Sequence, residues 1–136
     1  MKRSVFTIVV SLLAAASAPA FAADDLPMTS AFAGALASYR DCVIGAVDRS
    51  GVAEPDAMAA AALAACGAAH DVARRQLATD IIAVRPHAAT VAAQQAQSGM
   101  ATIEPMIAAI ALNHAREMVG EAATEAPVLA PTGNIG

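Results

Sequence analysis

Large apolar side chains recur at spacings of three and four residues along this chain, and that periodicity limits the folds open to it. Residues three and four apart lie on one face of an α-helix, so the pattern predicts amphipathic helices. No stretch shows the polar–apolar alternation or the clustered β-branched residues that a strand needs. We therefore predict an all-α fold.

Two helices are predicted in the first half of the chain. The first is capped by Thr29 or Ser30 and ends at about Asp48, before a turn that contains Gly51. The second covers about residues 54–84 and has a proline in its first turn, where proline is well tolerated. The apolar stripe of the first helix consists of Phe32, Leu36, Tyr39, Val43 and Val47.

Weaker patterns predict two further helices, at about 87–97 and 102–120. Arg85–Pro86 separates the earlier of these from the helix before it, because the residue before a proline disfavours helical geometry. If that junction is only a kink, the fold has three helices instead of four. Ser98–Gly99 predicts a turn, and Gly120 predicts the end of the last helix. Short connections between helices indicate a small antiparallel bundle of three or four helices.

Residues 1–22 have the organisation of a secretory signal peptide. Lys2–Arg3 supply a positive start, an almost purely apolar stretch follows to Ala16, and Ala20–Phe21–Ala22 is a small-x-small cleavage site. The apolar stretch is shorter than the roughly 20 residues of a transmembrane helix, which disfavours a membrane anchor. We predict export to the periplasm or the medium.

Removal of the signal peptide would leave a helical domain at residues 23–120 and a tail at residues 121–136. The tail is rich in proline and small residues, a composition typical of disordered segments.

Cleavage after residue 22 also changes the charge of the chain. The full chain has 8 basic and 12 acidic residues, and loss of Lys2 and Arg3 leaves 6 arginines, no lysine and a net charge of −6. The remaining aromatic side chains are Phe32 and Tyr39. Nucleic-acid-binding proteins need clustered cations and stacking side chains, and polybasic attachment to anionic lipid needs the same cations. We predict neither nucleic acid nor a membrane surface as a partner, whereas a protein partner and the oligomeric state stay open.

Cys42 and Cys66 are the only cysteines in the chain, and an exported protein meets oxidising conditions in which disulfides persist. Residue 54, midway between them, lies at the predicted turn between the first two helices. An antiparallel hairpin would bring the two cysteines level to within roughly 6 Å along the helix axes. A disulfide there would contribute roughly 3 kcal/mol to an alanine-rich domain that has little large apolar surface to bury. We predict a structural disulfide; reactive thiols are less favoured because no Cys-x-x-Cys motif is present.

The pattern Tyr39–Arg40–Asp41–Cys42, followed by Pro55–Asp56, an alanine-rich stretch and Cys66, resembles small exported helical proteins of bacteria that carry no assigned function. The resemblance covers about residues 32–77. It implies a cysteine-linked helical hairpin and nothing about activity.

Two histidines each stand four residues from a sulfur-containing side chain, a helical spacing that suggests candidate metal ligands. His114 and Met118 lie four residues apart, and a His with a Met in a helical bundle can ligate haem or copper. The competing interpretation places Met118 in the core and His114 at its edge. Cys66 and His70 have the same spacing, but an oxidised Cys66 has no thiolate to offer. His114, Met118 and His70 are the candidates, with His87 as a possible addition.

No catalytic constellation is evident. The neighbours His70 and Asp71 would diverge on a helix, the serines lack the glycine context of a nucleophile elbow, and His-Glu-x-x-His is absent. Arg74 and Arg75, next to Asp71 and Asp80, predict a balanced exposed face. We therefore expect no catalytic residues and no cofactor.

Two hypotheses for the function follow. The first is a small exported helical protein that acts without catalysis, as a binding or envelope-interaction module. The alternative is a periplasmic metal or haem binder that uses His114 and Met118.

Overall fold

The computed structural model of the chain describes residues 26–51 and 53–125. These ranges contain four α-helices and no strand, which confirms the all-α prediction. The signal peptide predicted at residues 1–22, and residues 126–136 of the predicted tail, lie outside the described residues. The helices are α1 (Ser30–Arg49), α2 (Pro55–Ala65), α3 (Gly67–Val84) and α4 (Ala92–Glu125), with a 3₁₀ turn, η2 (Pro86–Ala88), before α4.

The sequence of α1 accounts for its ends and for its buried face. The Thr29 hydroxyl accepts a hydrogen bond from the Phe32 backbone N–H at 3.0 Å, so Thr29 is the N-cap. Beyond the other end, Gly51 adopts φ 73°, a left-handed conformation that glycine takes without strain. The predicted stripe is confirmed: Phe32, Tyr39, Val43 and Val47 are buried, and Leu36 is half-buried beside them.

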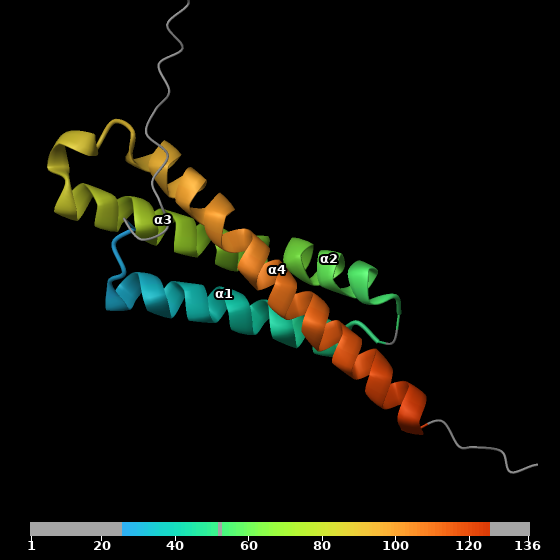
Figure 1. Ribbon diagram of the computed structural model, residues 1–136. Coiled ribbons are helices and arrows are strands. Elements are labelled where there is room, and N and C mark those ends of the chain that lie inside the picture. Colours follow the sequence, from blue (N-terminus) through green and yellow to red (C-terminus); the bar gives the residue numbers. More distant parts are fainter. Residues whose placement is uncertain (1–25, 52, 126–136) are drawn as a thin grey trace, which may run out of the picture.

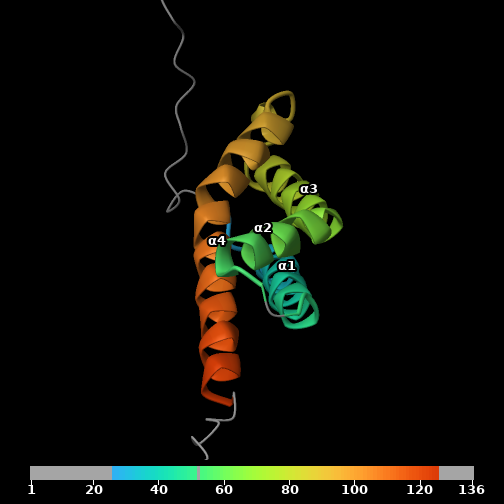
Figure 2. The same cartoon turned by 90° about the vertical axis from the view of Figure 1, so that its right-hand side faces the viewer.

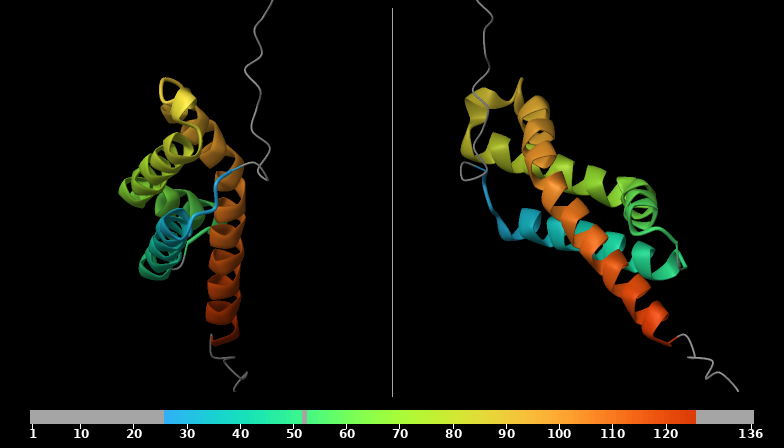
Figure 3. Two further views of the ribbon diagram at one scale, coloured as in Figure 1. Left: turned by 90° about the vertical axis from the view of Figure 1, so that its left-hand side faces the viewer. Right: turned by 45° about the vertical axis from the view of Figure 1, so that its right-hand side comes forward.

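The helices form a hairpin crossed by one long helix. α1 and α3 lie side by side and run in opposite directions (Figure 1). α2 precedes α3 in the same arm of the hairpin, with a bend between the two helices (Figure 3). α4 crosses this hairpin obliquely and forms a layer of its own beside it (Figure 2). The C-terminal turns of α4 extend beyond the other helices (Figure 3). α4 therefore contacts all three other helices and has a groove on each flank.

The predicted second helix is interrupted in its middle, at Cys66. The Cys66 backbone N–H donates to the carbonyls of both Ala62 and Leu63 at 3.2 Å, which tightens the last turn of α2. Its ψ of 20° departs from helical geometry, and α3 begins at Gly67, a poor helix former. The expectation of one continuous helix over residues 54–84 is therefore wrong.

The turn expected at Ser98–Gly99 is also wrong, because α4 runs unbroken through both residues. Gly99 serves close packing instead. A Cβ atom at this position would lie 2.9 Å from Cδ2 of Leu26 and 3.0 Å from Cδ2 of Leu77. The missing side chain therefore lets α4 approach α3, and the packing offsets the weak helix propensity of glycine.

Of the other predicted helix boundaries, one is confirmed and the rest are wrong. The break at Arg85–Pro86 is confirmed, since α3 ends at Val84. Pro105 lies deep inside α4 instead of in a first turn, and it cannot donate to the carbonyl of Ala101. α4 leans toward α3 in its N-terminal part, and an internal proline is a common cause of such bending (Figure 2). The helix also passes Gly120, so residues 121–125 of the predicted tail are helical.

The core lies between α4 and the hairpin. Its largest fully buried side chains come from all four helices: Phe32, Val43, Val47, Met58, Leu77, Ile81 and Met100. Buried alanines let the helices approach closely, among them Ala73, Ala92, Ala96, Ala111 and Ala115. None of the helices within residues 26–51 and 53–125 is both long and apolar enough to cross a membrane.

Asp80 is the one charged side chain in the described part of the chain that is buried, with 7% of its surface exposed. Its carboxylate accepts hydrogen bonds from the Thr29 hydroxyl at 2.6 Å and from Gln76 Nε2 at 3.0 Å. The expectation of an exposed Asp80 is wrong because α3 turns this residue toward the start of α1, whose dipole favours a negative charge. Thr29 thus caps α1 and ties it to α3.

Candidate functional site

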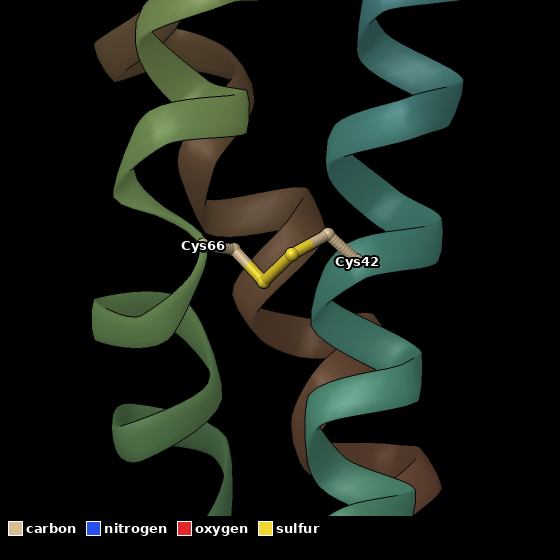
Figure 4. Close-up of a disulfide and its surroundings, with 2 residues drawn as sticks. All are labelled: Cys42 and Cys66. Atoms are coloured by element: carbon tan, nitrogen blue, oxygen red, sulfur yellow. A yellow bond between two sulfur atoms is a disulfide. The ribbon is translucent and has the colours of Figure 1, made fainter.

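The predicted disulfide is present, and it joins α1 to the junction of α2 and α3. The Cα atoms of Cys42 and Cys66 are 6.0 Å apart, within the usual range for a disulfide. Cys66 stands at the interruption between the two helices, with α4 passing behind the bond (Figure 4). Both cysteines are oxidised in this disulfide, so Cys66 offers no thiolate to a metal or a substrate.

The histidines among the predicted metal ligands belong to three different elements, α3, η2 and α4. His114 Nε2 lies 2.6 Å from Oδ1 of Asp48 on α1, while Met118 is half-buried and packs against the core. His87 is exposed in η2, and His70 is on α3. Among the residues that the structure describes, no group of three His, Cys, Asp or Glu side chains could hold a metal ion.

His70 lines a pocket of about 540 Å³ that we call the Glu104 pocket. The pocket lies where α4 crosses the junction of α2 and α3, and α1 contributes one side chain. Its polar side chains are Tyr39, His70 and Glu104, and its other lining residues are Leu63, Ala64, Gly67, Ala101, Pro105 and Ala108.

Three elements bring the polar side chains of the Glu104 pocket together. The rings of Tyr39 and His70 meet edge to face, with centroids 5.4 Å apart. His70 Nε2 lies 2.6 Å from Oε1 of Glu104, and its Nδ1 lies 3.7 Å from Oδ1 of Asp71. Nε2 is buried, yet no acceptor is in line with it for a hydrogen bond. The contact with Glu104 is therefore close but lacks the alignment of a hydrogen bond.

The lining of the Glu104 pocket has an acidic character, since it includes a carboxylate and no permanently charged cation. Burial, and secondarily the charge of Glu104, raises the pKa of the Tyr39 phenol. No lysine or arginine is among the lining residues. Pro105 adds to this character, because it has no N–H for the carbonyl of Ala101, and both residues line the pocket. The polar wall therefore has more capacity to accept hydrogen bonds than to donate them.

A second, smaller groove of about 310 Å³ lies on the other flank of α4, against α1. Its walls are apolar, and Met28 and Met106 are among its exposed side chains. Arg40, its charged lining residue, is paired with Asp41 at 2.8 Å. Because this groove brings no polar groups together, the Glu104 pocket is the candidate site.

Sequence reasoning found only one of the three polar residues of this pocket. The sequence predicts His70 only as a possible metal ligand, places Tyr39 in the core stripe and predicts no role for Glu104. Tyr39 is the only tyrosine of the chain, and Glu104 directly precedes a proline within a helical pattern. Both features can be recognised in the sequence, but neither indicates that the side chains of Tyr39 and Glu104 line the same pocket.

The chain matches no protein-family model, and no curated protein or solved structure is significantly similar to it.

Proposed function

We propose that the protein is a small exported helical module that acts by binding, with the Glu104 pocket as its binding site. One observation carries the proposal: a pocket with apolar walls has three ionisable side chains gathered on one side of it. Ligand sites commonly combine mostly apolar walls with a few convergent polar groups. The disulfide lies beside this pocket, since Tyr39 and His70 are a helical turn from Cys42 and Cys66 respectively, and so it braces the elements that form it.

Export to the periplasm or the medium is part of this proposal. The disulfide supports it, because such bonds persist mainly in oxidising compartments. The charge and hydropathy pattern of residues 1–22 and the resemblance to small exported bacterial helical proteins point the same way.

We propose binding, not catalysis, as the role of the pocket. Its lining contains no serine, threonine or free cysteine, so a covalent mechanism of those classes has no nucleophile there. The metal or haem alternative would use the ring nitrogen of His114 that does not face Asp48, because a ligating histidine commonly donates its other N–H to a carboxylate. It is tested separately by metal analysis and by the visible spectrum of the purified protein after incubation with haem.

A filling substitution tests whether the pocket binds ligands. Nile red, a neutral dye that fluoresces in apolar surroundings, should bind the oxidised protein and should be excluded by Ala108→Trp, which places an indole in the pocket. Ala109→Trp is the matched control, because Ala109 is the next residue of α4, is exposed and lines neither groove. Dye binding that is absent from the wild type, or that is equal in both variants, would overturn the proposal.

A further inference from the structure

We infer that the Glu104 pocket takes an organic cation that carries N–H donors on an apolar body, such as an alkylguanidinium or an alkylammonium. The inference rests on the proposed function, since it names the ligand class of the same site. It goes beyond that proposal because it states the charge of the ligand, whereas a pocket of the same size with neutral or basic side chains would select a different ligand.

The charges around the site favour a cation. Glu104 brings a carboxylate to the pocket; His70 is the one lining side chain that can carry a positive charge, and no arginine or lysine lines the pocket. The full chain has a net charge of −4, and the chain after residue 22 has a net charge of −6. A negative protein with an acidic pocket attracts cations at long range and repels anions.

Glu104 is placed to bind such a cation directly. Its side chain is 48% exposed, so a ligand can reach it from the mouth of the pocket. The 2.6 Å contact of His70 is made to Oε1, and a carboxylate has a second oxygen that can accept from a donor. A guanidinium can donate two parallel N–H groups to a carboxylate, which is the strongest form of this contact.

The charge of Glu104 contributes, after burial, to the raised pKa of the Tyr39 phenol, which lines the same pocket. A bound cation would offset the negative charge of Glu104. The same phenol therefore reports whether a ligand brings positive charge into the pocket.

The walls accept the apolar body of the ligand. Leu63, Ala64, Pro105 and Ala108 provide an apolar surface, and Gly67 leaves room, since a Cβ atom there would meet nothing within 4 Å. Burial of a hydrocarbon chain against this surface is favourable irrespective of the charge on the ligand. The charged group therefore decides selectivity.

Three ligands with the same hydrocarbon chain separate the contribution of charge from that of apolar burial. Octylguanidinium, 1-octanol and octanoate are titrated into the oxidised protein by calorimetry below their aggregation concentrations. Octylguanidinium should bind at least about tenfold more tightly than octanoate, as expected for a charge-assisted hydrogen bond. Glu104→Gln should remove this preference, and Glu121→Gln, which changes an exposed glutamate elsewhere on α4, should keep it.

A second measurement does not depend on any variant. Saturating octylguanidinium, which stays charged at alkaline pH, should shift the ionisation of Tyr39 to lower pH, and 1-octanol should not. Equal affinity for the three ligands, or an unchanged Tyr39 titration, would overturn the inference while leaving the proposed binding function intact. If none of the three ligands binds and Ala108→Trp leaves Nile red fluorescence unchanged, the proposed function itself fails.

Discussion

Tyr39 is the only tyrosine of the chain, and tryptophan is absent, so the ultraviolet absorbance of phenolate follows this one residue. Burial and the charge of Glu104 raise its pKa above the ordinary value of 10.0. The folded chain therefore holds the phenol proton more tightly than the unfolded chain does. The stability that results is complete below pH 10.0, the unfolded value, and is lost as the pH rises through the folded pKa.

Two substitutions test this account of Tyr39. Glu104→Gln should lower the pKa of the phenol but leave it above the ordinary value, because burial is the larger cause. Tyr39→Phe should remove the alkaline loss of stability that Tyr39 causes, as measured by urea unfolding across the alkaline range. A titration midpoint that does not move in Glu104→Gln would contradict the contribution of Glu104.

Thr29 contributes stability through both of its hydrogen bonds. Thr29→Val removes the cap of α1 and takes a donor from the buried carboxylate of Asp80. We expect the free energy of unfolding to fall by about 1–3 kcal/mol. Thr79→Val is the control: this exposed hydroxyl only donates to the Arg75 carbonyl of its own helix, so the change should stay within about 0.5 kcal/mol. Equal effects of the two substitutions in urea unfolding would show that the Thr29–Asp80 contact contributes nothing.

At the scale of elements, the approach of α4 to α3 depends on the missing side chain of Gly99. Gly99→Ala should destabilise the protein, because overpacking against Leu26 and the fully buried Leu77 costs about 1–3 kcal/mol, more than the gain in helix propensity. Gly34→Ala in α1 should instead stabilise it by about 0.5–1 kcal/mol, since its Cβ atom would meet nothing within 4 Å. Thermal unfolding of the two variants should move in opposite directions; a rise in both would mean that Gly99 is not needed for packing.

For the whole molecule, the Cys42–Cys66 disulfide is the one covalent constraint between distant parts of the described chain. It closes a loop with a sequence separation of 24 residues, and in the chain-entropy model its loss should lower the free energy of unfolding by roughly 3 kcal/mol. The double variant Cys42→Ala and Cys66→Ala, compared with the oxidised wild type in urea, measures this difference. Intact-mass analysis before and after reduction confirms that the wild type carries the bond, and equal stability of the two proteins would contradict its structural role.

Much of the fold could be predicted because it depends on neighbours in sequence. The spacing of Phe32, Tyr39, Val43 and Val47 is enough to predict the buried face of α1, and a threonine before that stripe is enough to predict the cap. The break before Pro86 follows from backbone sterics alone. These features need no information about what packs against them.

Other features depended on tertiary contacts. Glycine and proline favour a break in isolation, but α4 passes both Gly99 and Pro105 because its packing against α1, α2 and α3 compensates for their poor helix propensity. Asp80 is buried because Thr29 and Gln76 satisfy its carboxylate, and the Thr29 contact joins residues 51 positions apart.

The sequence by itself determined the helical class of this protein, the buried stripe of α1 and the position of the cysteine pair on either side of a turn. Only the tertiary structure decided the candidate site, because the crossing of α4 over the junction of α2 and α3 is what brings Glu104 to His70 and Tyr39. Local periodicity assigns each residue to a face of its own helix, but the angle and register at which two helices cross depend on the side chains of both.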